Sequence, residues 1–547
     1  MTRTLTLLFL LILLGSQYSC GFKSQKVDLI IHNANIYTVD ESFSKHEAMA
    51  IIDGKILDIG PEREILNKYS ATKTIDLAKQ VVYPGFIDAH CHFYGYGLHK
   101  TAIDLRGTKS WGECLKKIET YASNHTGDWI TGRGWDQNDW AIKEYPDNKE
   151  LSEMFPNKAV MIDRIDGHAA IVNNKVLEMA GIDENTSVEG GEIIKDSEGK
   201  LTGILIDNGK NKAIAIEPEP NNDMISESLL RAQEDCFENG LTTIDDAGLS
   251  MNVIRVIEKL HDSNKLKMRI YAMLNPEESS LEQMKKGHIN TEKLNVRSVK
   301  LYGDGSLGSR GACLKNQYSD SPNHVGALIE DPSFYHEWAE FCLTYGFQMN
   351  THCIGDSTNS ELLKTYANYV NVSDDLRWRI EHAQIVAPED RKYFKNFGII
   401  PSVQPTHATS DMYWAEDRLG EERMKGAYSY QSLLNQNGML ALGTDFPVEE
   451  ISPIKTFFAA VTRMDSENFP EGGFQMNEGL TREQAIKGMT IWAAISNFEE
   501  TTKGSLEKGK FADFVVLDRD ILTIDESKIL DSKVLYTFLD GEQVYKR

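Results

Sequence analysis

The sequence has no cluster of basic residues. Its 58 Lys and Arg are outnumbered by 82 Asp and Glu, which gives a formal net charge of -24. Because phosphate binding needs clustered Lys and Arg, this balance argues against a nucleic acid or an anionic membrane surface as partner. Beyond the first twenty residues, no stretch is apolar for long enough to cross a bilayer.

Cysteine is also scarce, with seven in 547 residues, and no dense disulfide framework is present. An even number in an oxidising compartment permits disulfides, but small buried thiols are the simpler interpretation. Six cysteines follow the leader: Cys91, Cys114, Cys236, Cys313, Cys342 and Cys353.

The first twenty residues, MTRTLTLLFLLILLGSQYSC, differ from the rest of the chain. Arg3 precedes an apolar run that is too short for a convincing membrane span, and this pattern predicts a secretory signal. Cys20 follows the run as in a bacterial lipoprotein signal, although Gln17 stands where an apolar residue is usual. We expect export to the bacterial periplasm or outer-membrane surface, with a lipid anchor on Cys20. Ordinary signal cleavage and an uncleaved anchor are the alternatives.

Both ends of the chain carry short alternating segments split by Gly, Asn and Asp, which predict antiparallel strands. Between them, apolar strands alternate with helical stretches, the pattern of a parallel sheet covered by helices. We therefore expect an α/β fold with a (β/α)8 TIM-like barrel and an additional β-sandwich domain formed from both ends. The candidate barrel strands are 81–92, 158–166, 241–248, 296–305, 347–356, 377–386, 398–405 and 439–448.

The expected domain boundaries follow from this pattern. An insertion at about 100–240 interrupts the barrel, and it is either a lid or structural padding. The predicted units are a signal peptide at 1–20, an N-terminal β-sandwich segment at 21–83, the metal-dependent barrel at 84–500 and a C-terminal β-sandwich segment at 501–547.

The stretch GFIDAHCHFYGYG, residues 85–97, places His90 and His92 around one cysteine. In a strand, residues i and i+2 point to the same face, so these two imidazoles would project together. Alone they are half of a metal site, and paired histidines without a metal are commoner. The other ligands must come from elsewhere in the chain.

Further candidate ligands stand at the carboxyl ends of other predicted strands. Singly, His382 is compatible with a core histidine, Asp445 with a helix cap and Lys300 with a solvated charge. Their recurrence at one end of a barrel favours one or two divalent ions held by nitrogen and oxygen donors. The full candidate set is His90, His92, Lys300, His352, His382 and Asp445.

Several long motifs point to a known family. They are PGFIDAHCH, VKLYGDGSLGSRGA, NTHCIGD, RIEHAQ, PSVQPTHATSD, LGTDFPV and KGSLEKGKFADFVVLD. With them the sequence resembles the amidohydrolase superfamily, in the YtcJ-like and N-substituted formamide deformylase-like branch (amidohydrolase family 3). The resemblance implies a metal-bearing barrel beside a β-sandwich made from both termini.

The resemblance also implies roles for the ligands. His90, His92 and Asp445 would hold the more buried ion, and His352 and His382 the more exposed one. Lys300 would bridge both ions as a carbamate, because a neutral, desolvated amine can react with carbon dioxide. Zinc is the expected metal, with a single ion if Lys300 stays unmodified.

The implied reaction is metal-assisted hydrolysis. Asp445 would take a proton from the attacking water and deliver it to the leaving nitrogen. The second metal, or a neighbouring donor such as His168 in DRIDGHAAIVN, would stabilise the oxyanion. A structural role at the end of the second strand is the alternative for His168.

The remaining candidates concern the substrate. His407 and Asp411 follow the seventh strand and are expected to bind or orient it. Tyr302 and Trp135 suggest an apolar or ring-bearing group, although loop aromatics often only pack a lid. Arg310 is either a ligand for a substrate carboxylate or a member of a structural ion pair.

The expected activity is hydrolysis of a C–N bond other than a peptide bond, in a small amide, N-formyl compound or cyclic amide. An esterase, lactonase or isomerase on the same site, a non-catalytic surface binding protein and a purely structural protein are the alternatives. The lipid anchor would be the sole membrane contact, and pairing into a homodimer is expected of such barrels.

Overall fold

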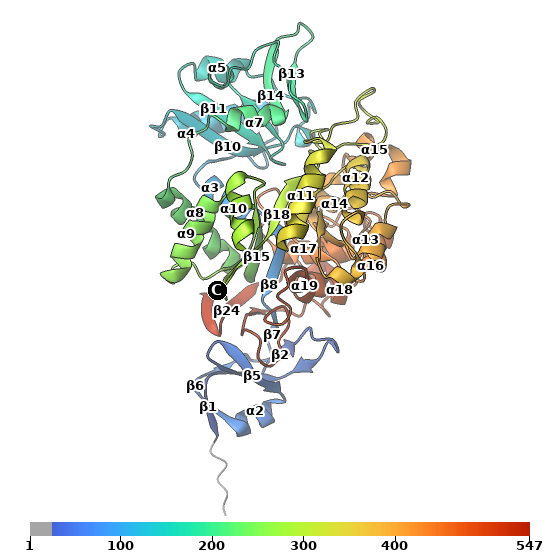
Figure 1. The fold of residues 1–547 in the computed structure, drawn as a ribbon. Coiled ribbons are helices and arrows are strands. Elements are labelled where there is room, and N and C mark those ends of the chain that lie inside the picture. The colour runs from blue at the N-terminus through green and yellow to red at the C-terminus, as the bar shows by residue number, and fades with distance from the viewer. Residues whose placement is uncertain (1–23) are drawn as a thin grey trace, which may run out of the picture.

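The computed structural model describes residues 24–547, so the predicted signal at 1–20 and Cys20 lie outside the described residues and stay predictions. Figure 1 shows three units stacked along the long axis of the molecule: a unit that spans residues 103–214 and is named the lid, a central barrel, and a small β domain at the opposite end from the lid. No helix in the described part of the chain is long and apolar enough to span a bilayer.

The central unit is a nearly closed barrel of parallel strands. Two backbone hydrogen bonds close the barrel between the end of its first strand and the segment that follows its last strand. The Asp445 amide donates to the His90 carbonyl at 2.8 Å, and the His92 amide donates to the Phe446 carbonyl at 2.8 Å. The predicted fold class is confirmed. In spatial order the strands are β8 (Phe86–Cys91), β15 (Leu241–Leu249), β16 (Arg269–Leu274), β18 (Leu294–Tyr302), β19 (Gln348–His352), β20 (Arg379–Glu381), β21 (Ile400–Val403) and β22 (Ala441–Leu442), with β17 (Ile289–Asn290) paired to β18.

Helices cover the outside of the barrel, and α9 (Met251–Asp262) illustrates why they form. The Ser250 hydroxyl accepts a hydrogen bond from the Val253 amide, while Ile254 and Ile257 lie on its buried face. The others are α3 (Phe93–His99), α8 (Asn222–Glu238), α10 (Glu278–Lys286), α11 (Pro332–Tyr345), α12 (Asp356–Ala367), α13 (Lys392–Phe397), α14 (Pro405–Asp411), α15 (Ala415–Met424), α16 (Tyr430–Asn437), α17 (Pro453–Thr462), α18 (Arg482–Gly488) and α19 (Ile491–Ser496).

One strand assignment from the sequence is wrong. The segment 158–166, expected as the second barrel strand, forms β11 (Ala159–Arg164) in the sheet of the lid. The third barrel strand is β16, which the sequence pattern missed because a short apolar run does not reveal which sheet it joins. Removing 158–166 from the barrel and adding β16 leaves three barrel strands before β18. Lys300 therefore still lies on the fourth barrel strand.

The lid is inserted between the first two barrel strands and has a mixed sheet of its own. Its core includes Trp135, Val160 and Ile171, all fully buried. The sheet contains β9 (Ile103–Asp104), β10 (Trp129–Trp135), β11, β12 (Ala169–Val172), β13 (Gly191–Lys195) and β14 (Leu201–Asp207), and the helices are α4 (Trp111–Ala122), α5 (Lys149–Met154), α6 (Asn174–Met179) and α7 (Asn208–Ile214).

The small β domain joins both ends of the described chain. Strand β7 (Val81–Pro84) pairs antiparallel with β23 (Phe514–Leu517), and Val82, Phe514 and Phe538 pack in a core between two sheets. The other strands are β1 (Gln25–His32), β2 (Asn35–Tyr37), β3 (Lys45–His46), β4 (Ala48–Ile52), β5 (Lys55–Gly60), β6 (Tyr69–Asp76), β24 (Val534–Leu539) and β25 (Glu542–Lys546), beside α2 (Glu62–Lys68).

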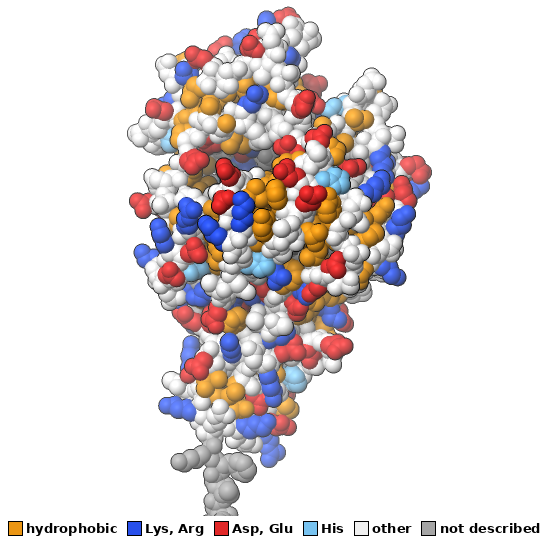
Figure 2. All heavy atoms as spheres, in the orientation of Figure 1, with side chains coloured by type: hydrophobic (Ala, Val, Ile, Leu, Met, Phe, Trp, Pro, Cys, Tyr) orange, Lys and Arg blue, Asp and Glu red, His pale blue; other side chains and the backbone are white. Residues whose placement is uncertain are grey.

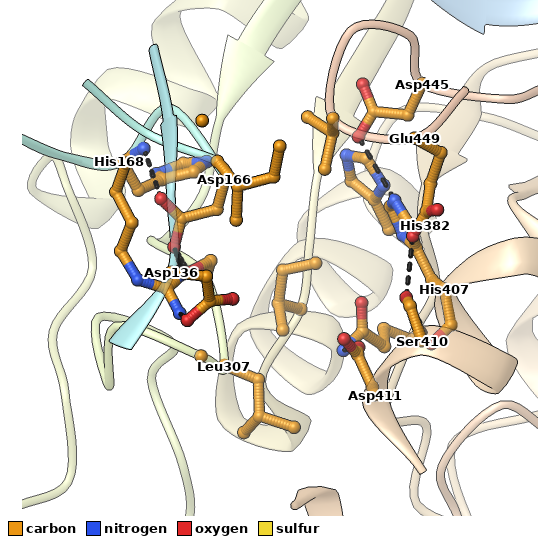
Figure 3. A pocket seen from close by; sticks show the side chains of 18 of the residues that line it. Asp136, Asp166, His168, Leu307, His382, His407, Ser410, Asp411, Asp445 and Glu449 are labelled. Atoms are coloured by element: carbon orange, nitrogen blue, oxygen red, sulfur yellow. Dashed lines mark hydrogen bonds and ion pairs between the residues drawn. The ribbon is translucent and has the colours of Figure 1, made fainter. Parts of the chain in front are cut away.

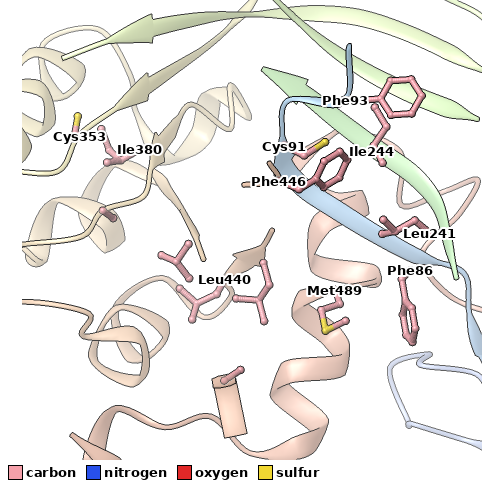
Figure 4. Packing of buried hydrophobic residues seen from close by; sticks show 14 of the residues in the cluster. Phe86, Cys91, Phe93, Leu241, Ile244, Cys353, Ile380, Leu440, Phe446 and Met489 are labelled. Carbon is pink, nitrogen blue, oxygen red and sulfur yellow. The ribbon is translucent and has the colours of Figure 1, made fainter. Parts of the chain in front are cut away.

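The first barrel strand is held in an apolar interior. Figure 4 shows Phe86 and Cys91 on β8 near Leu241 and Ile244 of β15. Burying a phenylalanine such as Phe86 contributes about 1.5–3 kcal/mol. This packing holds β8, and with it the carboxyl end that leads to the two histidines, in place.

All six cysteines in the described residues are free thiols, as the simpler interpretation expected.

Candidate metal centre and active site

His90 and His92 lie together at the end of the first barrel strand. The Nδ1 atom of His90 is 2.6 Å from Oε2 of Glu381, and Nδ1 of His92 is 3.0 Å from the Ala247 carbonyl oxygen. A carbonyl can only accept, and a carboxylate accepts as well, so Nδ1 carries the proton in each ring. In each ring Nε2 is therefore the nitrogen whose lone pair is suited to bind a cation.

Asp445 follows the last barrel strand, β22, and its carboxylate lies next to these two imidazoles. Its Oδ1 lies 3.3 Å from Nε2 of His92 and 3.7 Å from Nε2 of His90, while Oδ2 lies 3.5 Å from Nε2 of His407. The residue has a positive φ of 60°, which a non-glycine residue adopts only when its surroundings impose it. The carboxylate thus bridges two sets of imidazoles.

Two groups of three side chains offer ligand atoms within 4.8 Å of one another, and Asp445 belongs to both. The first contains His90 and His92, and the second contains His382 and His407. Buried Oδ1 of Asp445 and Nε2 of His407 make no hydrogen bond with any described residue. Unpartnered buried donors and acceptors are costly, so this donor set fits one or two divalent ions.

His352 adjoins the second group without belonging to it. Its ring centroid is 4.5 Å from that of His382, but its Nε2 lies 3.8 Å from Oδ1 of Asp304. Burial, reinforced by neighbouring charge, holds the pKa of His352 and of His382 well below the usual range, so both rings are neutral at pH 7. Geometrically, His407 rather than His352 completes the second group, although His407 was predicted from the sequence to bind substrate.

Lys300 is fully buried at the centre of the barrel end. Its Nζ lies 3.1 Å from Nε2 of His90, and burial lowers its pKa to about 8 despite the opposing charges of Glu381 and Asp445. Roughly a tenth of such an amine is neutral at pH 7. This is the form that reacts with carbon dioxide.

A cavity of about 370 Å³ lies over these groups, between the barrel and the lid. Figure 3 shows His382, His407 and Asp445 on one wall and His168 and Asp166 on the opposite wall. Lys300, Tyr302 and Asp411 line it too. On the face drawn in Figure 2, Lys and Arg side chains are interspersed with Asp and Glu.

His168 reaches the cavity from the lid and not from a barrel strand, in contrast to its expected place at the end of the second strand. It lies in the turn between β11 and β12, with Nδ1 2.7 Å from Oδ1 of Asp207. Although burial works against it, the Asp207 hydrogen bond and the charges of Asp207 and Asp166 raise the pKa of His168. The Asp207 contact therefore favours the imidazolium form, in which Nε2 also carries a proton.

The predicted substrate-binding residues divide into two sets. Tyr302 and Asp411 line the cavity, and Asp411, whose pKa burial raises to about 7, accepts a hydrogen bond from the Tyr428 hydroxyl at 2.7 Å. Trp135 does not reach it. This tryptophan is fully buried in the lid, where its Nε1 donates to the Ile162 carbonyl at 3.0 Å. It packs the lid because its position on β10 faces the sheet core.

The sequence model described as "Amidohydrolase family" matches residues 73–545 of the chain. The chain belongs to the amidohydrolase family. The resemblance inferred from the motifs is thus confirmed. Family membership and the two ligand groups make this amidohydrolase a metal-dependent hydrolase.

Three relatives match this amidohydrolase over most of its length. LONG AFTER FAR-RED 3 of Arabidopsis thaliana is 34% identical over 95% of this chain and 91% of its own length. YtcJ of Bacillus subtilis, named as an amidohydrolase, is 30% identical over 95% of this chain and 99% of its own. The N-substituted formamide deformylase of Arthrobacter pascens is 26% identical over 96% of this chain and 99% of its own.

A solved structure has the same overall arrangement. An uncharacterized metal-dependent hydrolase from Pyrococcus horikoshii OT3 is 28% identical and superposes with a TM-score of 0.74, over 91% of this chain and 99% of the other. The lid, the barrel and the β domain of the amidohydrolase therefore have counterparts along nearly the whole of that chain.

The residues that support the first imidazole were not predicted from the sequence. Glu381 is fully buried and bridges His90 to Arg379, whose Nε lies 2.7 Å from Oε1 of Glu381. Burial opposes ionisation, but the Arg379 charge outweighs it and holds the pKa of Glu381 below its usual range. The sequence feature that could have identified Glu381 was its position directly before His382 in RIEHAQ.

Glu381→Gln is expected to weaken metal affinity about ten- to hundred-fold, as loss of a carboxylate behind a ligating imidazole typically does. The fold should survive because Arg379 keeps Asp245 at 2.9 Å. Zinc competition against a chromophoric chelator measures the change. Glu478→Gln, at a buried glutamate bound to Ser432 outside the cavity, is the matched control. Unchanged affinity in Glu381→Gln would contradict the positioning role.

Proposed function

We propose that this amidohydrolase cleaves C–N bonds other than peptide bonds in small amides, N-formyl compounds or cyclic amides. The observation that carries the proposal is the pair of ligand groups sharing Asp445 beneath the cavity. The relative named N-substituted formamide deformylase supports the N-formyl class in particular.

One or two zinc ions are the proposed cofactor, held by His90, His92 and Asp445 and by His382 and His407, with His352 adjoining. A bound divalent ion supplies a Lewis acid and lowers the pKa of water from about 15.7 to near 7. We further propose that Lys300 is carboxylated, since its burial next to His90 favours the reactive neutral amine. The carbamate would add two oxygen donors to the site.

Asp445 is the proposed proton carrier. Burial works against its ionisation, yet the neighbouring imidazoles of His92, His90 and His382 hold the pKa of Asp445 well below its usual range. The carboxylate is therefore ready to accept the proton of the attacking water. It then delivers that proton to the leaving nitrogen, which departs as a neutral amine.

His168 is the proposed donor on the opposite wall. Asp207 holds its Nδ1, so Nε2 is directed away from that contact, and the ring centroid lies 4.8 Å from that of His352. A proton on Nε2 would stabilise negative charge on the former carbonyl oxygen in the transition state. The lid thereby contributes to chemistry as well as to enclosure.

A substrate panel before and after metal removal tests this function. Purified protein is dialysed against chelator, restored with zinc, and assayed on N-formyl amines, simple amides, cyclic amides and matched esters. We expect hydrolysis of the C–N substrates to disappear with the metal and to return with zinc. His90→Asn should abolish it, whereas His336→Asn, at a histidine that hydrogen-bonds Tyr369 outside the cavity, should retain it. Metal-dependent turnover of esters alone would contradict the proposal.

A further inference from the structure

A second chamber of about 230 Å³ opens beside the main cavity. It lies between α3 of the barrel and the β9–β10 edge of the lid. Arg106, Gly134 and Ile165 line both spaces, so the two are neighbours with a shared wall. The two spaces are therefore adjacent, as a substrate that reaches from the metal ligands into the chamber would require.

The chamber is cationic although the protein is acidic. Three of its eleven lining residues, Lys100, Arg106 and Arg133, are cations, and Asp104 is the only carboxylate among the eleven. Arg106 is held by Asp104 through two hydrogen bonds of 3.0 and 2.8 Å, and Lys100 pairs with Asp235. These two cations already have carboxylate partners, whereas the third has none among the described residues.

Arg133 is fixed without a counter-ion. Its Nε and Nη2 both donate to the Ile165 carbonyl oxygen, at 3.2 and 2.7 Å, and no carboxylate of residues 24–547 forms an ion pair with it. The remaining guanidinium donors are free of protein carboxylates. A held guanidinium without a partner is suited to bind a carboxylate in a fork.

Three carboxylates lie near enough for their charges to act on Arg133, those of Asp163, Asp445 and Asp166, but none forms an ion pair with it. Asp163 lies 2.9 Å from Nζ of Lys210. Asp166 lies 2.6 Å from Nη1 of Arg164. Asp445 belongs to the ligand groups, so an incoming carboxylate would meet in Arg133 an arginine without an ion pair in the described part of the chain.

Close packing of β10 against the loop after β9 forms one side of the chamber. Gly134 has a φ of 112°, and a Cβ there would lie 2.7 Å from Cγ of Arg106. Glycine is needed for this close approach of β10 to the loop after β9. Burial and the charge of Arg133 together lower the pKa of His99 to about 3, so His99 is a neutral hydrogen-bonding group in the chamber.

We propose that the chamber is a subsite for a carboxylate carried by the substrate, with Arg133 as its ligand. The inference rests on the proposed function, since it assigns that reaction to amides or N-formyl amines bearing a carboxylate. The C–N bond would lie over the ligand groups while the carboxylate enters the chamber. Arg310, the arginine singled out in the sequence, is not available for this role because it pairs with Asp320 at 2.8 Å.

Matched substrate pairs test the subsite by turnover. N-formyl amines of increasing chain length are compared with a terminal carboxylate and with the corresponding terminal carboxamide. We expect the carboxylate form of one chain length to be preferred in kcat/KM by about ten-fold or more. In Arg133→Gln this ratio should fall to near one, and Arg133→Lys should restore some of it. Arg310→Gln is the matched control and should keep the ratio. A ratio unchanged in Arg133→Gln would overturn the inference.

A binding measurement separates the subsite from the reaction. Calorimetry with 3-phenylpropionate and with 3-phenylpropan-1-ol, which carries no amide bond, on metal-replete protein gives the carboxylate preference without any turnover. We expect Arg133→Gln, and also Ala102→Phe, which fills the chamber at a half-buried residue without removing charge, to lose this preference. Equal preference in both variants would mean that the carboxylate binds elsewhere. Arg133-dependent binding without hydrolysis of any amide would refute the proposed function and leave the subsite standing.

Discussion

Asp445→Asn is expected to lower kcat by about a thousand-fold, within the range that positioned acid–base groups contribute. Asparagine keeps the size of the side chain but neither accepts the proton of the attacking water nor carries it to the leaving nitrogen. Because Asp445 belongs to both ligand groups, metal affinity should fall as well. Kinetics at saturating zinc and saturating amide substrate therefore isolate the loss in proton transfer.

Asp390→Asn is the matched control for Asp445→Asn. Asp390 is also buried, but it pairs with Lys315 at 2.8 Å and does not line the cavity. Its variant should keep kcat within about two-fold, as substitutions remote from the reacting groups generally do. An Asp445→Asn protein that binds zinc fully and loses less than about ten-fold in kcat would assign the proton transfer to another residue.

Lys300→Ala is expected to reduce metal content from two ions per chain to one or none, with a loss of kcat of at least about a hundred-fold. The reason is that the buried amine, with its pKa lowered to about 8, is the proposed source of the bridging carbamate. The neutral share of this amine rises as the pH rises through 8, so carbamate formation should increase over the same interval. Elemental analysis gives the metal count, and a carbamate signal after exposure to ¹³C-labelled carbon dioxide tests the modification.

Lys503→Ala is the control for removing a buried lysine. Lys503 pairs with Glu499 at 2.9 Å and does not line the cavity, so its variant should keep the metal count and the labelled carbamate. One metal ion in both the unaltered protein and Lys300→Ala, without a carbamate signal, would contradict the bridged pair and leave a single-ion site with an unmodified lysine.

Much of the candidate site could be predicted because its residues stand at the ends of short apolar runs. His90 and His92 precede α3, His352 ends β19, and Lys300 stands two residues before the end of β18. The carboxyl ends of parallel barrel strands meet at one face of the fold, which places side chains from distant segments together. Identifying the strands was therefore enough to place these residues near one another.

The errors share a different physical cause. The segment 158–166 has the pattern of a buried parallel strand and is one, but nothing local to it shows that its sheet belongs to the lid. Trp135 looked like a pocket aromatic, and only the packing of β10 shows that its ring is turned into the lid core. A local pattern predicts burial without revealing which core buries the residue.

The sequence by itself determined the chemistry of the donors, the strand ends that carry them and the family, because period-two alternation, strand-end position and ordered motifs are local properties. Only the tertiary structure decided which donors share a ligand group, which wall His168 occupies and which arginine of the second chamber has no carboxylate partner among the described residues. Those relations depend on contacts across long stretches of chain, such as His90 with Glu381 over 291 residues, and become defined only when the barrel closes and the lid packs over it.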